Sequence, residues 1–112
     1  MPYENNGKTL ESDANGYLVN MEDWNEEVAA VIAQAEGIGE LTQKHWDLIN
    51  YQRSEYFDNN EQPMERAINK GMSKVWGKKV TSKDLYVLFP LAPSKQGNKI
   101  AGLPYVARKG GY

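Results

Sequence analysis

The chain has 112 residues, of which 40% are hydrophobic, and a formal net charge of −2. This length suits one domain with a small core, and three Trp and seven Tyr argue against disorder. Cysteine is absent and His45 is the single histidine, which excludes disulfides, thiolate nucleophiles and Cys-based or His-rich metal sites. No apolar run reaches the length of a membrane span and no secretory signal is present, so we expect a cytoplasmic protein without cofactor or metal.

The two parts of the chain carry opposite charge. Residues 1–65 contain fourteen acidic and three basic residues, a net charge of −11. Residues 66–112 contain ten basic residues and one acid, Asp84, a net charge of +9. Such asymmetry indicates either a basic surface for an acidic partner, nucleic acid or protein, or an attraction between the two parts within one fold. Both interpretations stay open at this point.

Residues 1–19 are predicted to form an N-terminal β-hairpin. Asn5-Asn6-Gly7 is a tight-turn sequence, because Asn and Gly tolerate the positive φ that two-residue turns require. Residues 8–11 would form the return strand, and residues 13–16 a second turn. An isolated hairpin is marginally stable in water, so we expect this one to pack on helices.

Residues 20–100 are predicted to form a bundle of about five short helices, because apolar residues recur there at spacings of three and four. The expected helices span residues 20–36, 42–59, 63–76, 81–89 and 95–100. Asn20 and Thr42 are the expected N-caps of the first two, Pro63 is the expected first residue of the third, and Thr81 opens the fourth with a capping box. His45 falls in the first turn of the second helix, where we expect a packing or surface role rather than a catalytic one.

The third predicted helix has a polar and an apolar side. Its apolar stripe contains Met64, Ile68, Met72 and Val75. Lys70, Lys74 and Lys78 recur every four residues on the other side, so we expect them to be exposed. Together with Lys79 and Lys83 they could face phosphates if the second to fourth helices form a helix-turn-helix variant. The row lacks the Asn, Gln and Arg side chains that usually read bases, and an exposed lysine row is also typical of a solvated helix face.

Seven short motifs along the chain resemble those of one family. They are Asp13-x-Asn15-Gly16-Tyr17-Leu18, Trp24, Val31-Ile32-Ala33, His45-Trp46-Asp47, Leu85-Tyr86-x-Leu88-Phe89-Pro90, Pro93-x-Lys95-Gln96 and Ile100-Ala101-Gly102-Leu103-Pro104. In this order they resemble the DsrC/TusE/DsvC family of small sulfur-relay proteins, over essentially the whole chain. The resemblance implies a mainly α fold: an orthogonal helical bundle with an N-terminal β-hairpin and a mobile C-terminal arm at residues 101–112, in a single domain of residues 1–112.

The resemblance also implies a function from which this sequence departs. DsrC-type members serve dissimilatory sulfite reductase, and TusE-type members pass sulfur towards tRNA 2-thiouridine synthesis. The family arm carries a penultimate cysteine as sulfur carrier, and DsrC-type members add a second cysteine eleven residues earlier. Counted from Ala101-Gly102-Leu103-Pro104, the carrier position is Lys109 and the second cysteine position is Asn98. The printed chain also runs two residues longer at this end than the family pattern. A lysine ammonium cannot hold sulfur as a persulfide, so we expect this chain not to be an enzyme or carrier of that kind.

Three functions are compatible with this departure. The first is a binding or regulatory paralogue whose arm docks on sulfur-relay proteins or on a complex like dissimilatory sulfite reductase. Its predicted contact residues are Lys95, Lys99, Tyr105, Arg108 and Lys109. The plainer interpretation of the same residues is a copy whose tail has drifted.

The other two functions use different parts of the chain. Nucleic-acid binding would use the lysine row to contact DNA or tRNA. A third possibility is sulfur carriage through Gly110-Gly111, which loss of Tyr112 would expose as a C-terminus similar to that of ubiquitin-like sulfur carriers. A Gly-Gly pair near a terminus is more often simply flexible.

Overall fold

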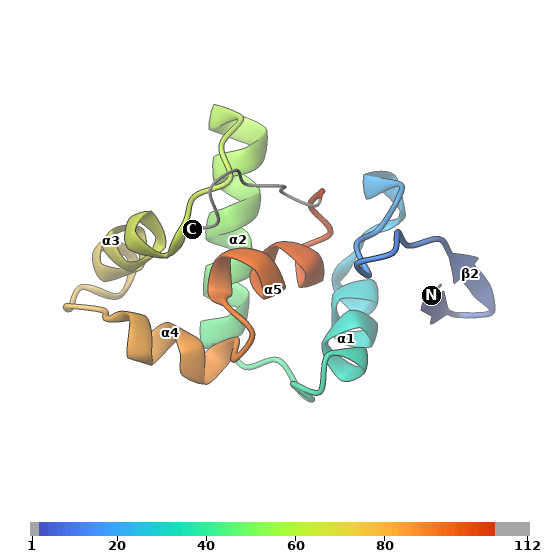
Figure 1. The fold of residues 1–112 in the computed structure, drawn as a ribbon, viewed down its shortest axis with the longest axis horizontal. Coiled ribbons are helices and arrows are strands. Elements are labelled where there is room, and N and C mark those ends of the chain that lie inside the picture. The colour runs from blue at the N-terminus through green and yellow to red at the C-terminus, as the bar shows by residue number, and fades with distance from the viewer. Residues whose placement is uncertain (1–2, 105–112) are drawn as a thin grey trace.

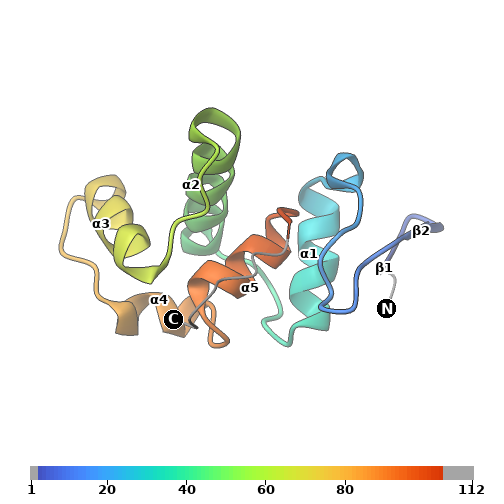
Figure 2. The same ribbon diagram turned by 45° about the horizontal axis from the view of Figure 1, so that its top comes forward.

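In the computed structural model, which describes residues 3–104, helix α5 lies at the centre of the molecule (Figure 1). The elements are β1 (Tyr3–Asn5), β2 (Lys8–Leu10), the 3-10 turn η1 (Met21–Asp23), α1 (Glu26–Ala35), α2 (Gln43–Asn59), α3 (Glu65–Trp76), α4 (Ser82–Leu88) and α5 (Pro93–Ile100). Helix α5 packs against all four other helices, and the hairpin lies beyond α1 (Figure 2). The predicted mainly α fold with an N-terminal hairpin is therefore confirmed.

The hairpin is confirmed together with its turn. Strands β1 and β2 pair antiparallel with Asn5 opposite Lys8, which leaves Asn6-Gly7 as a two-residue turn with φ values of 54° and 78°. Both residues thus adopt the left-handed conformation that this turn requires. The hydroxyl of Tyr3 donates to the carbonyl of Gly16 at 2.6 Å, which ties the hairpin to the second predicted turn.

The first helix begins later than predicted. Asn20 caps only the short turn η1, and Trp24 then adopts an extended conformation with ψ 139°. Helix α1 starts at Glu26, with Asn25 as its N-cap. The indole N–H of Trp24 donates to the carbonyl of Ile100 at 2.8 Å. Trp24 thus makes a tertiary contact from an extended backbone. This contact interrupts the helix that local propensity favours.

Two other helix starts also differ from the prediction. Pro63 is buried and lies before Met64, the N-cap of α3, so it is not the first helical residue. Helix α5 starts at Pro93, two residues earlier than predicted, and has no N-cap side chain of its own. Glu65 of α3 supplies the missing acceptor, because its carboxylate accepts the backbone N–H of Ser94 at 3.0 Å. A free N–H group at a helix N-terminus is stabilised by such a negative charge.

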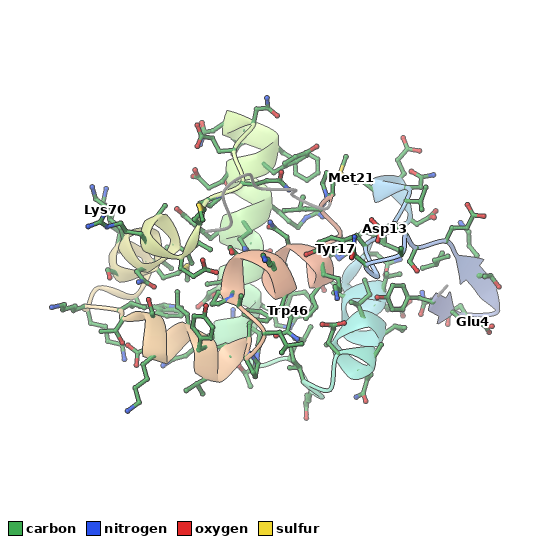
Figure 3. All side chains as sticks on the ribbon, in the orientation of Figure 1. Glu4, Asp13, Tyr17, Met21, Trp46 and Lys70 are labelled. Carbon is green, nitrogen blue, oxygen red and sulfur yellow. The ribbon has the colours of Figure 1, made fainter. Side chains whose placement is uncertain are left out.

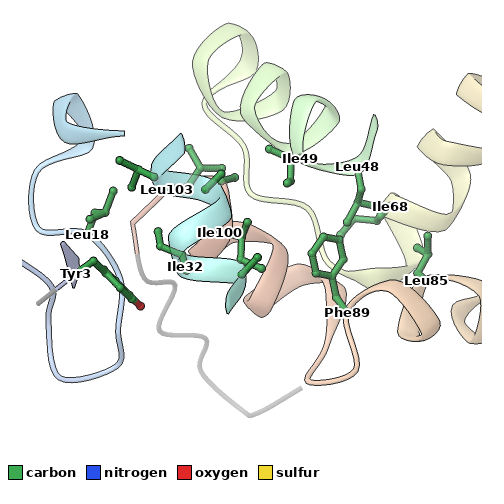
Figure 4. Packing of buried hydrophobic residues seen from close by; sticks show 14 of the residues in the cluster. Tyr3, Leu18, Ile32, Leu48, Ile49, Ile68, Leu85, Phe89, Ile100 and Leu103 are labelled. Atoms are coloured by element: carbon green, nitrogen blue, oxygen red, sulfur yellow. The ribbon is translucent and has the colours of Figure 1, made fainter. Parts of the chain in front are cut away.

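The core surrounds α5 and draws on every helix (Figure 4). Fully buried side chains are Ile32, Leu48, Ile49, Ile68, Met72, Leu85, Phe89, Ile100 and Leu103. Each large aliphatic or aromatic side chain buried in this way contributes about 1.5–3 kcal/mol to folding. Val75, which its spacing placed on an apolar stripe, is instead 55% exposed, and Phe57 of α2 is 54% exposed. Both lie near the C-terminal ends of their helices, and α2 extends past the bundle at that end (Figure 1).

Candidate functional site: the base of the C-terminal arm

Residues 100–104, here called the arm base, are fixed to the core through their backbone carbonyls. Three side chains from separate segments donate to them. Trp24 donates to Ile100 at 2.8 Å, Arg53 of α2 donates to Ala101 at 2.6 Å, and Gln62 donates to Pro104 at 2.9 Å.

Burial places the arm base in the core of the bundle. The side chain of Leu103 is fully buried and lies near Leu18 and Ile100 (Figure 4). The predicted arm began at residue 101, but residues 101–103 are buried. The bundle therefore holds the chain as far as Pro104.

Arg53 and Trp24 form a stacked pair beneath the arm base. The guanidinium carbon of Arg53 lies 3.8 Å from the centroid of the Trp24 ring, a cation–π geometry. Burial lowers the pKa of Arg53 from its ordinary value. Gly102 has a φ of 73°, and a Cβ atom there would lie 2.3 Å from Cδ1 of Trp24. The arm base therefore needs glycine at this position, for both its conformation and its close approach to the indole.

Asn98, the position of the second family cysteine by resemblance, lies inside the structure. It belongs to α5 and is 1% exposed. Its backbone carbonyl accepts the N–H of Leu103 at 2.9 Å, which closes the turn into the arm base. Among the described residues its side-chain Oδ1 has no hydrogen-bond partner. Lys109, the carrier position by resemblance, lies outside the described residues, as do Tyr105, Arg108 and Gly110-Gly111.

The two predicted contact lysines of α5 differ in their surroundings. Lys95 is exposed. Lys99 is only 17% exposed, and its Nζ lies 3.0 Å from Oε2 of Glu36. The other carboxylate oxygen of Glu36 accepts a hydrogen bond from Gln96 at 3.0 Å. Lys99 thus connects α5 to the end of α1, and this bond occupies its ammonium group.

All five residues of the predicted lysine row are exposed. They lie on α3, on α4 and on the connection between them, with Lys70 at the outer edge of α3 (Figure 3). Within residues 3–104, none of the five forms an ion pair. The one nearby amide on this side, Asn69, donates to the hydroxyl of Ser82 at 2.9 Å. These five lysines form an exposed basic surface.

His45 is a structural residue, in agreement with the prediction. Its Nδ1 accepts the backbone N–H of Thr42 at 3.0 Å, which completes a capping box at the start of α2. With Nδ1 as acceptor, Nε2 carries the proton and donates to the carbonyl of Leu88 at 3.0 Å. Both ring nitrogens are thus engaged, and the ring packs edge-on against Phe89 at 5.2 Å.

Within the described part of the chain, no group of three His, Cys, Asp or Glu side chains is placed to hold a metal ion. None of the helices described between residues 3 and 104 has the length and apolar character needed to cross a bilayer.

The residues that hold the arm base were not predicted as functional residues. By its spacing Arg53 shares one face of α2 with Ile49 and Tyr56. A charged residue in an apolar stripe is a signal in itself, because a buried guanidinium needs acceptors. Gln62 carried no such signal, since it lies in a connection without periodicity.

The fold and site together define a small helical-bundle protein whose chain is held to the core as far as Pro104. The family model described as "DsrC like protein" matches residues 4–107. The chain belongs to this family, as its motifs predicted.

Named relatives and solved structures agree with this assignment. The chain is 44% identical over 99 residues to the sulfurtransferase TusE of Yersinia pseudotuberculosis, covering 88% of this chain and 91% of the relative. It is 43% identical over 99 residues to that of Escherichia coli K12, covering 88% and 90%.

Two solved structures have the same fold. The NMR structure of DsrC from Allochromatium vinosum superimposes with a TM-score of 0.85 at 40% identity, covering 96% of this chain and 98% of that one. The oxidised gamma-subunit of dissimilatory sulfite reductase, DsrC, from Archaeoglobus fulgidus gives a TM-score of 0.87 at 33% identity, with the same coverage. The family is a sulfur-relay family, and the printed sequence has no cysteine.

Proposed function

We propose that this chain binds the partners of a sulfur relay without carrying sulfur itself, as a non-catalytic binding or regulatory member of its family in the cytoplasm. The observation that carries the proposal is an arm base held by three side chains in a chain with zero cysteines. Sulfur carriage as a persulfide needs a thiolate. Neither Lys109 nor Asn98 provides one.

The arm base supports binding because it fixes where the arm leaves the bundle. Arg53 and Trp24, stacked below Gly102, hold the chain at this point. Lys95, Tyr105, Arg108 and Lys109 are the proposed contact residues, which suits an acidic surface with a site for one aromatic ring. The proposed partners are proteins that receive TusE in a sulfur relay or DsrC in dissimilatory sulfite reductase.

Binding without sulfur transfer is tested by competition. The full chain is titrated into a sulfur-transfer assay containing a cysteine-bearing TusE or DsrC from the same host and its partner. We expect transfer to fall as the chain is added, and intact mass after exposure to a persulfide donor to show no added sulfur. A variant ending at Pro104 is the control and should compete much more weakly. Added sulfur on this chain, or absence of both binding and competition, would contradict the proposal.

Nucleic-acid binding is the second candidate, favoured by the five exposed lysines of α3, α4 and their connection, which form no ion pair within residues 3–104. Electrophoretic mobility shift of duplex DNA and of tRNA at low and moderate salt tests it. Binding of this kind weakens steeply with salt, because phosphate contacts release counterions. No shift at low salt would remove this candidate. Sulfur carriage by a trimmed Gly110-Gly111 end remains the weakest alternative, and intact mass from the native host would reveal loss of Tyr112 together with a gain of sulfur.

A further inference from the structure

A small pocket opens between α2, α3 and α4, away from the arm base. Its volume is about 190 Å³. The apolar part of its lining consists of Trp76, Val80, Val87 and Leu88, and three charged residues, Lys44, Lys78 and Asp84, complete it. We call these seven residues the α4 pocket. Helix α4 lies beside the N-terminal end of α5, whereas the arm base follows its C-terminal end (Figure 1).

The pocket has the size and lining of a site for one side chain. Sites for drug-sized ligands begin at about 300 Å³, so this pocket is too small for one. Val87, one of the lining residues, is 75% exposed. Trp76 is held in place, because its indole N–H donates to Asp47 at 2.8 Å. A pocket with a fixed aromatic wall and an exposed apolar side chain in its lining is typical of a protein interaction site.

The charges around the pocket favour an acidic partner. Lys44 and Lys78 line it, Lys79 and Lys83 are close in the chain, and all four are exposed and form no ion pair within the described residues. Asp84 is the one acid. Its carboxylate accepts the N–H of Thr81 at 3.0 Å, and this bond, helped by Lys78 and Lys44, lowers its pKa. The carboxylate of Asp84 therefore serves the cap of α4, and the lysines are left in excess.

We propose that the α4 pocket docks an acidic segment of a partner protein. One bulky aliphatic or aromatic side chain enters between Trp76, Val87 and Leu88. Asp or Glu residues beside it in the segment pair with Lys44 and Lys78. Charge complementarity of this kind raises the association rate and selects the partner.

A nucleic acid fits this pocket less well. Single-stranded bases bind by stacking on exposed aromatic faces. Here the ammonium of Lys44 lies 5.4 Å from the centroid of the Trp76 ring, and the edge of that ring is bonded to Asp47. The remaining walls are aliphatic and offer no base-reading group.

This inference goes beyond the proposed function and does not depend on the arm. If both hold, a partner grips the protein at two separate places, one at each end of α5. Two linked contacts give a higher avidity than either alone, without any new contact in the pocket. Deletion of residues 105–112 separates the two proposals, since it removes the arm contact and leaves the α4 pocket intact.

The probe is a random peptide library displayed on phage and selected against the full chain. We expect the selected peptides to share one Leu, Ile, Phe or Trp flanked by Asp or Glu. A synthetic peptide of the best sequence should bind the double variant Lys44→Gln/Lys78→Gln about tenfold more weakly, as expected when paired charges at an interface are removed. The double variant Lys70→Gln/Lys74→Gln changes the net charge equally outside the pocket, and should bind within about twofold of the parent.

The indole N–H signals of the three tryptophans locate the bound peptide by NMR. The signal of Trp76 should move on titration, whereas that of Trp24, which donates to the arm base, should not. Peptide binding should survive deletion of residues 105–112. The proposal is overturned if selection yields no acidic peptides with an apolar anchor, if both double variants lose binding equally, or if the Trp24 signal moves instead. It is likewise overturned if a short duplex DNA displaces the peptide and binds to the parent chain more tightly.

Discussion

Gly102 shows how a single residue sets the path of the arm base. We expect Gly102→Ala to lower the free energy of unfolding by about 2–5 kcal/mol, through left-handed strain of about 1–2 kcal/mol and overpacking of about 1–3 kcal/mol. The strain follows from its φ of 73°, and the overpacking from a Cβ atom 2.3 Å from Cδ1 of Trp24. Urea denaturation measures the loss.

Gly37 provides the matched control for this substitution. Its φ is 80°, and a Cβ atom there would meet no atom within 4 Å. Gly37→Ala therefore carries the conformational cost alone, about 1–2 kcal/mol. Equal losses in the two variants would show that the contact between the arm base and Trp24 is not tight.

A single residue, His45, makes the free energy of unfolding depend on pH. Burial lowers its pKa from the ordinary 6.5, so the unfolded chain binds a proton more readily than the folded one. The contribution of neutral His45 to folding stability is then fully present above pH 6.5. It is lost as the pH falls from there towards the lower pKa of His45 in the folded state. Protonation would also remove the acceptor for the N–H of Thr42.

The expected result is a lower urea midpoint at about pH 5.5 than at about pH 7.5, in the range where histidine titrates. His45 is the single histidine, so His45→Gln should flatten this part of the pH profile. A profile that keeps its slope in the variant would assign the dependence to other groups.

At the scale of elements, helix α2 holds the arm base through Arg53. We expect Arg53→Lys to lower stability by about 1–2 kcal/mol, because lysine keeps the charge but loses the planar stack on Trp24 and the fork-shaped donor to Ala101. Hydrogen exchange should show faster exchange of the Leu103 amide, which donates to Asn98. Arg66→Lys is the control, since Arg66 is exposed on α3. An unchanged Leu103 amide would show that Arg53 does not secure the arm base.

Local sequence patterns predicted where some of the helices begin, but not where all of them begin. The Asn6-Gly7 turn and the caps at Thr42 and Thr81 were predicted, because each is encoded within four neighbouring residues. The start of α5 was not, because its acceptor, Glu65, comes from another helix.

At the scale of the molecule, the acidic and basic parts of the chain meet in the ion pair of Glu36 with Lys99. Its side chains are 14% and 17% exposed. Removing one partner leaves the other half-buried and unpaired, so we expect Lys99→Met to cost about 1–3 kcal/mol, as for other partly desolvated polar groups. Thermal or urea unfolding measures it.

Lys8→Met is the control for the ion pair. Lys8 lies 3.6 Å from Asp23, but its side chain is 71% exposed. An exposed pair contributes about 0–1 kcal/mol. Similar small losses in both variants would mean that the pair of Glu36 and Lys99 is screened like a surface pair.

Charge patterning could not by itself decide between internal attraction and a free basic surface. The structure contains both, since Lys99 pairs across the two parts while the lysines of α3 and α4 remain exposed and unpaired within the described residues. Which lysine does which depends on the packing of α5 against α1, and no sequence spacing encodes that.

The sequence by itself determined the family, the hairpin with its turn, the number of helices and the absence of a thiol. These follow from short motifs, periodicity and composition, all of which are local. Tertiary structure decided where α1 and α5 begin, that the chain is held as far as Pro104, and that Val75 is exposed. Each of these depends on contacts between residues distant in sequence, such as Trp24 with Ile100 and Gln62 with Pro104. A backbone carbonyl in a connecting segment can accept from any nearby donor, so which donor it receives is decided only when the helices pack.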